Sequence, residues 1–281
     1  MTDWLEIQRG SAPLILSFPH TGTVIPAELE PRLESPWLSR KDADWWVHEL
    51  YDDLARALDA TTIRTTISRT VIDVNRDPDG KSLYPGQATT ELCPLTTFDG
   101  ERLYRRQSEP GALEIIARRK RYFEPYHAAL ATEIERLRGR HGCVVLYDAH
   151  SIRSKVPRLF DGLLPHLNIG TYGGASCDVT LTRDVERVCD GTEFSHVSNG
   201  RFRGGWTTRH YGQPSRGVHA LQMELACRGY LDEPDGAVGP SNWPASYDGL
   251  RAEPLRKVLG NVLQACLDFA HTAPQAAARD V

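Results

Sequence analysis

The chain has 281 residues, 40% of them hydrophobic and 25% charged, a composition typical of a soluble globular protein that buries a large core. Its formal net charge is -4, so electrostatics give no reason to expect nucleic acid or an anionic membrane as a partner. Residues 1–10 lack the character of a secretory signal, and no apolar run approaches the ~20 residues of a membrane span. We therefore expect a cytoplasmic protein that acts without a membrane.

The first part of the chain is predicted to alternate strands with helices. Residues 14–18 form an apolar run that ends in a turn at His20, a pattern typical of a buried strand. Residues 45–57 have the apolar spacing of a helix, with acidic side chains gathered toward its start. Residues 61–75 are rich in β-branched side chains and predict two strands, and residues 77–101 predict a long ordered loop.

The rest of the chain continues the alternation. It is predicted to contain helices at residues 109–139, 177–189 and 255–270, and strands at residues 143–147, 195–205 and 218–225. No linker or internal repeat interrupts the pattern, so we expect residues 1–281 to form one α/β domain with a largely parallel sheet and helices on both faces. Active sites of such sheets lie beyond the carboxyl ends of the strands.

Two histidines occupy equivalent places at the ends of predicted strands, His20 after residues 14–18 and His150 after residues 143–147. A hydrolytic zinc site needs about three N or O protein ligands and one open position, so this pair suggests a metal centre rather than two unrelated turn histidines. The acidic third ligand remains open among Asp42, Asp44 and Glu49. We favour Asp44, since helix capping accounts for at least one of the two aspartates.

Glu224 lies inside an apolar segment, where a carboxylate is costly unless it is paired or catalytic. It is the candidate general base for a metal-dependent hydrolase, the alternative being a structural salt bridge. Asn75 and Arg76 follow a predicted strand, and an arginine fork suits a substrate carboxylate. Further candidate cations are Arg201, Arg203 and Arg209, which surround a Gly-rich loop and are otherwise exposed loop arginines.

Motifs of other enzyme classes are absent from the sequence. It contains no serine nucleophile elbow, phosphate-binding loop or dinucleotide fingerprint at a usable place. Serine acyl transfer, kinase and dehydrogenase chemistry are therefore disfavoured.

Several motifs together resemble the N-formylglutamate deformylase (N-formylglutamate amidohydrolase) family of bacterial histidine degradation, and the resemblance covers nearly the whole chain. The motifs are SFPHTG at residues 17–22, DADW at 42–45, IDVNR at 72–76, LYPGQ at 83–87 and LCP at 92–94. The family looks like a branch of the zinc carboxypeptidase and aspartoacylase group. The resemblance implies a three-layer fold with a mixed, mostly parallel sheet, and an enzyme that releases formate and glutamate from N-formyl-L-glutamate.

The resemblance also implies roles for single residues. His20 and His150 match the histidine ligands of Zn²⁺ or another divalent ion, Glu224 resembles the late glutamate base, and Asn75–Arg76 resembles a substrate-binding pair. The wider group places its acidic ligand three residues after the first histidine, where this chain has Thr23. Two alternative functions stay open: a deacylase of another N-acyl acidic amino acid such as an N-acyl aspartate, and a non-catalytic protein that binds acidic amino acids.

Overall fold

A computed structural model describes residues 3–83 and 86–273, and the predicted LYPGQ motif lies outside this part of the chain at Tyr84 and Pro85. The described residues form a seven-stranded sheet in the order β1-β3-β2-β4-β7-β5-β6. Its strands are β1 (Leu5–Gln8), β2 (Leu14–Phe18), β3 (Thr61–Thr65), β4 (Val144–Ile152), β5 (Leu167–Gly170), β6 (His196–Ser198) and β7 (Val218–Ala226).

The sheet is mixed and mostly parallel, which confirms the predicted fold class. The neighbours β3, β2, β4 and β7 at its centre all run parallel, and β6 runs parallel to β5. Only the β1–β3 and β5–β7 pairings are antiparallel. The carboxyl ends of β2, β4 and β7 therefore lie at one edge of the sheet.

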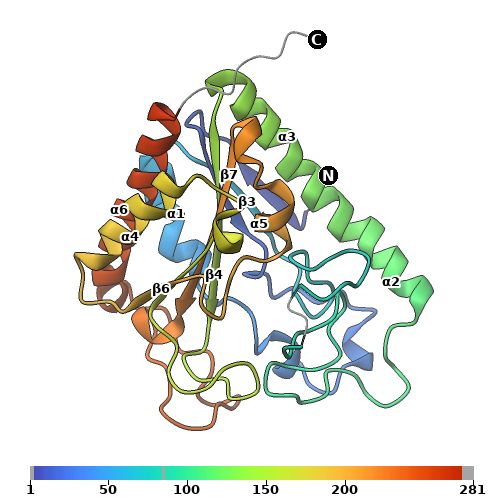
Figure 1. Cartoon of the computed structure of the whole chain (residues 1–281). Helices are drawn as coiled ribbons and strands as arrows, with labels where there is room; N and C mark the ends of the chain where they lie inside the picture. Colours follow the sequence, from blue (N-terminus) through green and yellow to red (C-terminus); the bar gives the residue numbers. More distant parts are fainter. Residues whose placement is uncertain (1–2, 84–85, 274–281) are drawn as a thin grey trace.

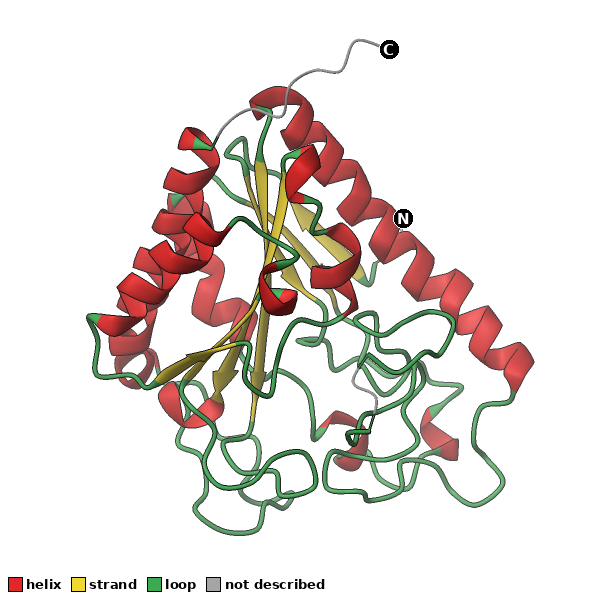
Figure 2. Ribbon diagram, in the orientation of Figure 1, coloured by secondary structure: helices red, strands yellow, loops and turns green. Residues whose placement is uncertain are grey.

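Helices cover both faces of the sheet, as Figures 1 and 2 show. They are α1 (Val47–Ala57), α2 (Ala112–Arg118), a π-helical turn (Arg119–Phe123), α3 (Glu124–His141), α4 (Val179–Asp190), α5 (Trp206–Tyr211) and α6 (Gly249–Thr272). Helices α1, α4 and α6 pack on one face, and α3 and α5 lie on the other. The predicted helix at residues 109–139 is the continuous run from α2 to α3.

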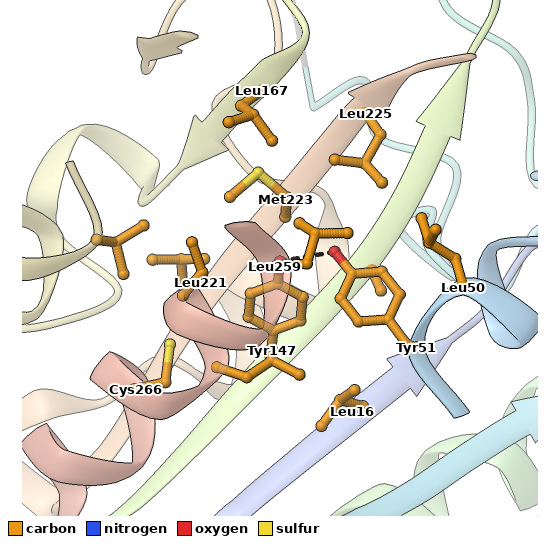
Figure 3. Packing of buried hydrophobic residues seen from close by; sticks show 14 of the residues in the cluster. Leu16, Leu50, Tyr51, Tyr147, Leu167, Leu221, Met223, Leu225, Leu259 and Cys266 are labelled. Carbon is orange, nitrogen blue, oxygen red and sulfur yellow. Dashed lines mark hydrogen bonds between the residues drawn. The ribbon is translucent and has the colours of Figure 1, made fainter. Parts of the chain in front are cut away.

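Alternation along the central strands divides the core into two layers. Leu16, Tyr147 and Leu221 point toward α1 and α6, where Figure 3 shows them beside Leu50, Tyr51 and Leu259. Their neighbours Ile15, Leu146 and Ala220 belong to the opposite cluster, under α3. The same alternation places a set of buried polar side chains on the α3 and α5 face, namely Ser17, Asp148, His150, Gln222 and Glu224.

Three strand predictions need correction. Residues 61–75 contain one strand, β3, because residues 69–76 fold into buried turns in which Arg69 and Asp73 form an ion pair. His150 lies within a strand rather than after it, since β4 pairs with β7 as far as Ile152. The strand predicted at 195–205 is limited to β6, beyond which the chain forms bends and an irregular segment.

No helix in the described ranges combines the length and the apolarity needed to cross a lipid bilayer.

Candidate active site

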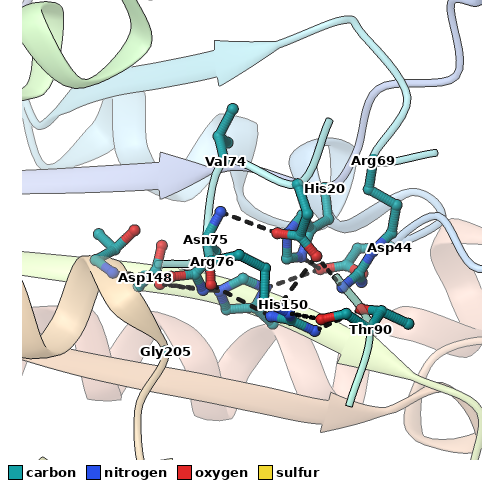
Figure 4. Close-up of polar contacts among 12 residues, drawn as sticks. His20, Asp44, Arg69, Val74, Asn75, Arg76, Thr90, Asp148, His150 and Gly205 are labelled. Atoms are coloured by element: carbon teal, nitrogen blue, oxygen red, sulfur yellow. Dashed lines mark hydrogen bonds and ion pairs between the residues drawn. The ribbon is translucent and has the colours of Figure 1, made fainter. Parts of the chain in front are cut away.

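His20, Asp44 and His150 converge at the carboxyl edge of the sheet (Figure 4). One ligand atom from each of these buried residues lies within 4.8 Å of the others. The Asp44 backbone N–H donates to the His20 carbonyl at 2.9 Å, which holds the chain before α1 against the end of β2. The Asp44 Oδ2 atom then lies 3.0 Å from His150 Nδ1 and 3.7 Å from His20 Nδ1.

The other two acidic candidates lie outside this group. The Asp42 carboxylate accepts a hydrogen bond from the Phe98 backbone N–H at 2.6 Å and so anchors a loop. Glu49 is exposed on α1. Of the three residues left open by the sequence, the structure brings only Asp44 to the two histidines.

Each histidine ring is held through its second nitrogen by a buried carboxylate. His20 Nε2 lies 2.6 Å from Asp73 Oδ1, and His150 Nε2 lies 2.9 Å from Asp148 Oδ2. A carboxylate on one ring nitrogen fixes the tautomer and leaves the other nitrogen available to a metal. Both Nδ1 atoms therefore face the Asp44 carboxylate.

Two atoms of the group support metal binding. His20 Nδ1 and Asp44 Oδ1 are buried without a hydrogen-bond partner, which is costly for groups removed from water. A cation bound between them would satisfy both atoms. Two imidazole nitrogens and a carboxylate oxygen form a donor set suited to a divalent ion with an open coordination position, so the residues fit a metal centre.

The charges of the site stabilise two of its carboxylates, those of Asp44 and Asp73, as anions. Burial alone would raise the pKa of Asp44, but the hydrogen bond with His150 and the nearby His20 ring outweigh this effect and bring the pKa below its usual range. For Asp73, burial is likewise outweighed, here by the charges of Arg76, His20 and Arg69, so its pKa lies well below the usual value. Both carboxylates are therefore ionised at neutral pH.

A solvent-open cavity lies over this group. The residues that line it include His20, His150, Glu224, Asn75, Gln222 and the three arginines Arg69, Arg76 and Arg201. An apolar wall is contributed by Phe98, Ile152, Leu159 and Phe202. The cavity thus combines a candidate metal group, a carboxylate and several cations.

Glu224 reaches this cavity from β7. It is the register partner of His150 on β4, and both side chains lie on the same face of the sheet. Burial raises the pKa of Glu224 to about 7, against an opposing effect of the nearby His150. A carboxyl group with this pKa is suited to accept a proton near neutral pH.

The arginines at the cavity differ in how they are held. Arg76 donates to Thr90 O at 3.1 Å, to Thr90 Oγ1 at 3.0 Å and to Asn75 O at 3.2 Å. Arg69 is almost completely buried, forms an ion pair with Asp73 at 2.7 Å and packs over the Phe98 ring at 4.7 Å. Arg201 donates to two backbone carbonyls, those of Leu159 and Ala88.

Arg203 and Arg209 are not among the described residues that line the cavity. Arg203 is exposed and donates to Asn199 O at 3.2 Å. Arg209 donates to the Gly204 and Leu83 carbonyls and lies over the Tyr172 ring. Their role in substrate binding stays a prediction.

The family model for N-formylglutamate amidohydrolase matches residues 12–231, which is more than half of the chain. The chain belongs to the N-formylglutamate amidohydrolase family. Two N-formylglutamate deformylases are each 44% identical over 268 residues: that of Pseudomonas putida, with 94% of this chain and 95% of the relative covered, and that of Pseudomonas aeruginosa, with 95% and 97% covered.

Solved structures agree with this family in their fold. An N-formylglutamate amidohydrolase from Ralstonia eutropha matches with a TM-score of 0.74 at 23% identity, covering 95% of this chain and 97% of that one. A gene product from Agrobacterium tumefaciens matches with a TM-score of 0.69 at 18% identity, covering 94% and 95%. Both matches support the three-layer arrangement around the mixed sheet.

Sequence reasoning about this N-formylglutamate amidohydrolase chain assigned no role to Arg69, Asp73, Asp148 or Gln222. The sequence does contain a pattern that indicates a site role for Asp148 and Gln222. Each lies two residues before a candidate site residue on a strand and therefore shares its face. The pattern for Arg69 and Asp73 is weaker. Their i,i+4 spacing on a turn indicates a site role only once Asp73 is known to contact His20.

Proposed function

We propose that this chain hydrolyses N-formyl-L-glutamate to L-glutamate and formate with a divalent metal ion, Zn²⁺ in the first instance, held by His20, Asp44 and His150. The names of the 44% identical relatives support the substrate. The observation that supports metal dependence best is that two buried atoms of the three-residue group, His20 Nδ1 and Asp44 Oδ1, have no hydrogen-bond partner among the described residues.

The proposed reaction divides the chemistry between the metal and the protein. A bound Zn²⁺ would supply Lewis acidity, polarising the formyl carbonyl and lowering the pKa of water toward ~7. The Glu224 carboxylate accepts a proton from the attacking water and passes it to the departing amine, as the new C–O bond replaces the C–N bond. Arg69, with Nη1 at 3.7 Å from Asp44 Oδ1, stabilises the negative charge that develops on the carbonyl oxygen.

The two carboxylates of the substrate require cations on the other side of the cavity. The hydrogen bonds of Arg76 to described residues use one N–H on each of its three nitrogens, and Nη1 also lies 3.6 Å from Asp73 Oδ2. Each terminal nitrogen therefore has a second N–H that no hydrogen bond to a described residue takes up. Two such N–H groups match the two oxygens of one carboxylate. Arg201 lines the same cavity and is proposed to contact the second carboxylate.

Removal of the Arg76 guanidinium is expected to affect binding more than turnover. In Arg76→Ala the KM for N-formyl-L-glutamate should rise by about 10- to 100-fold, the effect of a lost charge-assisted contact, while kcat changes much less. Steady-state kinetics of the purified variant measure both constants. Arg121→Ala, at an exposed arginine on the π-helical turn, is the matched control. A fall in kcat with an unchanged KM would place Arg76 elsewhere in the mechanism.

The proposed function is tested by formate release from N-formyl-L-glutamate before chelation, after chelation and with Zn²⁺ restored. We expect activity that disappears with the metal and returns with it. N-acetyl-L-glutamate and N-formyl-L-aspartate are run beside it, and faster turnover of either would reassign the acyl or amino-acid specificity. We propose further that residues 1–281 form one cytoplasmic domain, and that the enzyme performs the last step of a histidine degradation route.

A further inference from the structure

Two buried side-chain amides lie between the metal group, Glu224 and the start of α5. The Asn75 Oδ1 atom accepts from the Thr207 backbone N–H at 2.8 Å. The Gln222 Oε1 atom accepts from the Gly205 backbone N–H at 2.7 Å. Only the oxygen of an amide can accept these bonds, so the NH₂ group of each amide is left to donate to other partners.

The NH₂ groups point at the two parts of the site that carry the chemistry. Asn75 Nδ2 donates to Asp148 Oδ2 at 3.1 Å, the same oxygen that binds His150 Nε2. Gln222 Nε2 donates to Glu224 Oε2 at 3.1 Å. One amide therefore supports the carboxylate behind a metal ligand, and the other supports the proposed base.

The backbone that orients these amides sits directly on them. A Cβ atom at Gly205 would come within 2.4 to 2.6 Å of the Asn75 amide atoms, so no larger residue fits at that position. The Trp206 backbone N–H also approaches the Asn75 carbonyl at 3.5 Å. Asn75 and Gln222 are nearly completely buried, so water cannot easily replace the bonds they make.

We propose that Asn75 and Gln222 are positioning residues whose amides are oriented by the Gly205–Thr207 backbone. The Asn75 amide holds the Asp148 carboxylate against His150. The Gln222 amide holds one oxygen of Glu224, so that the other oxygen is directed at the substrate. This inference rests on the proposed function for its kinetic part. It gives Asn75 a role beside the substrate contact predicted from the sequence, because both ends of its amide bond to the protein.

Replacement by the matching acid separates this role from a purely structural one. Gln222→Glu keeps an oxygen to accept from Gly205 but, once its carboxyl group is ionised, loses the donor to Glu224, whereas Gln222→Met loses both. If Gln222 had only a structural role, Gln222→Glu would keep a kcat close to that of the wild type. The positioning role predicts that both variants lose kcat by about 10- to 100-fold, the effect of one hydrogen bond to a charged group, with KM nearly unchanged. Wild-type kcat in Gln222→Glu would overturn the assignment, and so would a rise in KM alone.

The corresponding change at Asn75 is measured through the metal. Asn75→Asp keeps the acceptor for Thr207 and loses the donor to Asp148, so competition with a chelator should show Zn²⁺ affinity lowered by about 10- to 100-fold, as for other outer-shell partners. Wild-type Zn²⁺ affinity in this variant would overturn the Asn75 part. This measurement needs no turnover, so it still tests the inference if the wild type fails to hydrolyse N-formyl-L-glutamate, an outcome that would count against the proposed function alone.

The control is the same pair of substitutions at an exposed amide, Gln264→Glu and Gln264→Met on α6, where the side chain donates a hydrogen bond to Asp268. These variants should keep wild-type kinetics and Zn²⁺ affinity. Thermal unfolding of every variant shows whether it is folded before its kinetics are compared.

Discussion

Glu224→Gln is expected to lower kcat by about 10²- to 10⁴-fold, the usual contribution of a positioned general base. The amide has nearly the same shape as the carboxyl group but cannot accept the proton of the attacking water. KM and bound metal should change little, because the metal group consists of His20, Asp44 and His150. Kinetics and metal analysis of the purified variant measure both. Glu253→Gln, at a half-exposed carboxylate on α6, is the control.

The pH profile gives the same prediction a second readout. Burial raises the pKa of Glu224 to about 7, so the group is protonated and inactive as a base at lower pH. Wild-type kcat/KM should therefore rise with pH and reach a plateau, with the midpoint of the rise at or below about pH 7. The midpoint can lie below 7 because a bound divalent cation would lower the pKa of Glu224. Glu224→Gln should lack this limb. An unchanged acidic limb in the variant would mean that another group controls it.

Strand alternation made part of the site predictable. Asp148 and His150 are two residues apart on β4, as are Gln222 and Glu224 on β7, so each pair had to share a face if both segments were strands. The parallel neighbours β4 and β7 then bring the two pairs together. The shared face of Asp148 and His150, and that of Gln222 and Glu224, could therefore be predicted from the sequence pattern, whereas the distances between these side chains could not.

The turn that carries Arg69, Asp73 and Asn75 was mispredicted for a physical reason. Its β-branched residues favour a strand locally, but its polar side chains bond to partners far away in the chain: Asp73 to His20, and Asn75 to Asp148 and Thr207. Such tertiary contacts override local propensity. The residues that bond to the Asn75 amide lie 73 and 132 positions away, so these hydrogen bonds could not be predicted from the local sequence.

The choice among acidic ligands illustrates the same limit. Asp42 and Asp44 both lie just before α1, and helix capping or dipole arguments apply equally to them. The distinction comes from the bond between the Asp44 N–H and the His20 carbonyl, and from the left-handed backbone of Trp46 at φ 63°, which redirects the chain into α1. A non-glycine residue in that region is uncommon and persists where the surrounding structure holds it.

Asp44→Asn should therefore release the metal, whereas Asp42→Asn and Glu49→Gln should retain it. Loss of an outer-shell partner alone weakens metal binding by about 10- to 100-fold, so loss of the only carboxylate among the three candidate ligands should cost at least about 100-fold, and activity should fall with the metal content. Metal analysis after dialysis and Zn²⁺ titration measure the change.

Because the three substitutions each remove one negative charge within eight residues of sequence, a general charge effect would weaken binding in all three. Loss confined to Asp44→Asn would identify the carboxylate as a direct ligand, and full Zn²⁺ affinity in that variant would contradict the proposed metal centre.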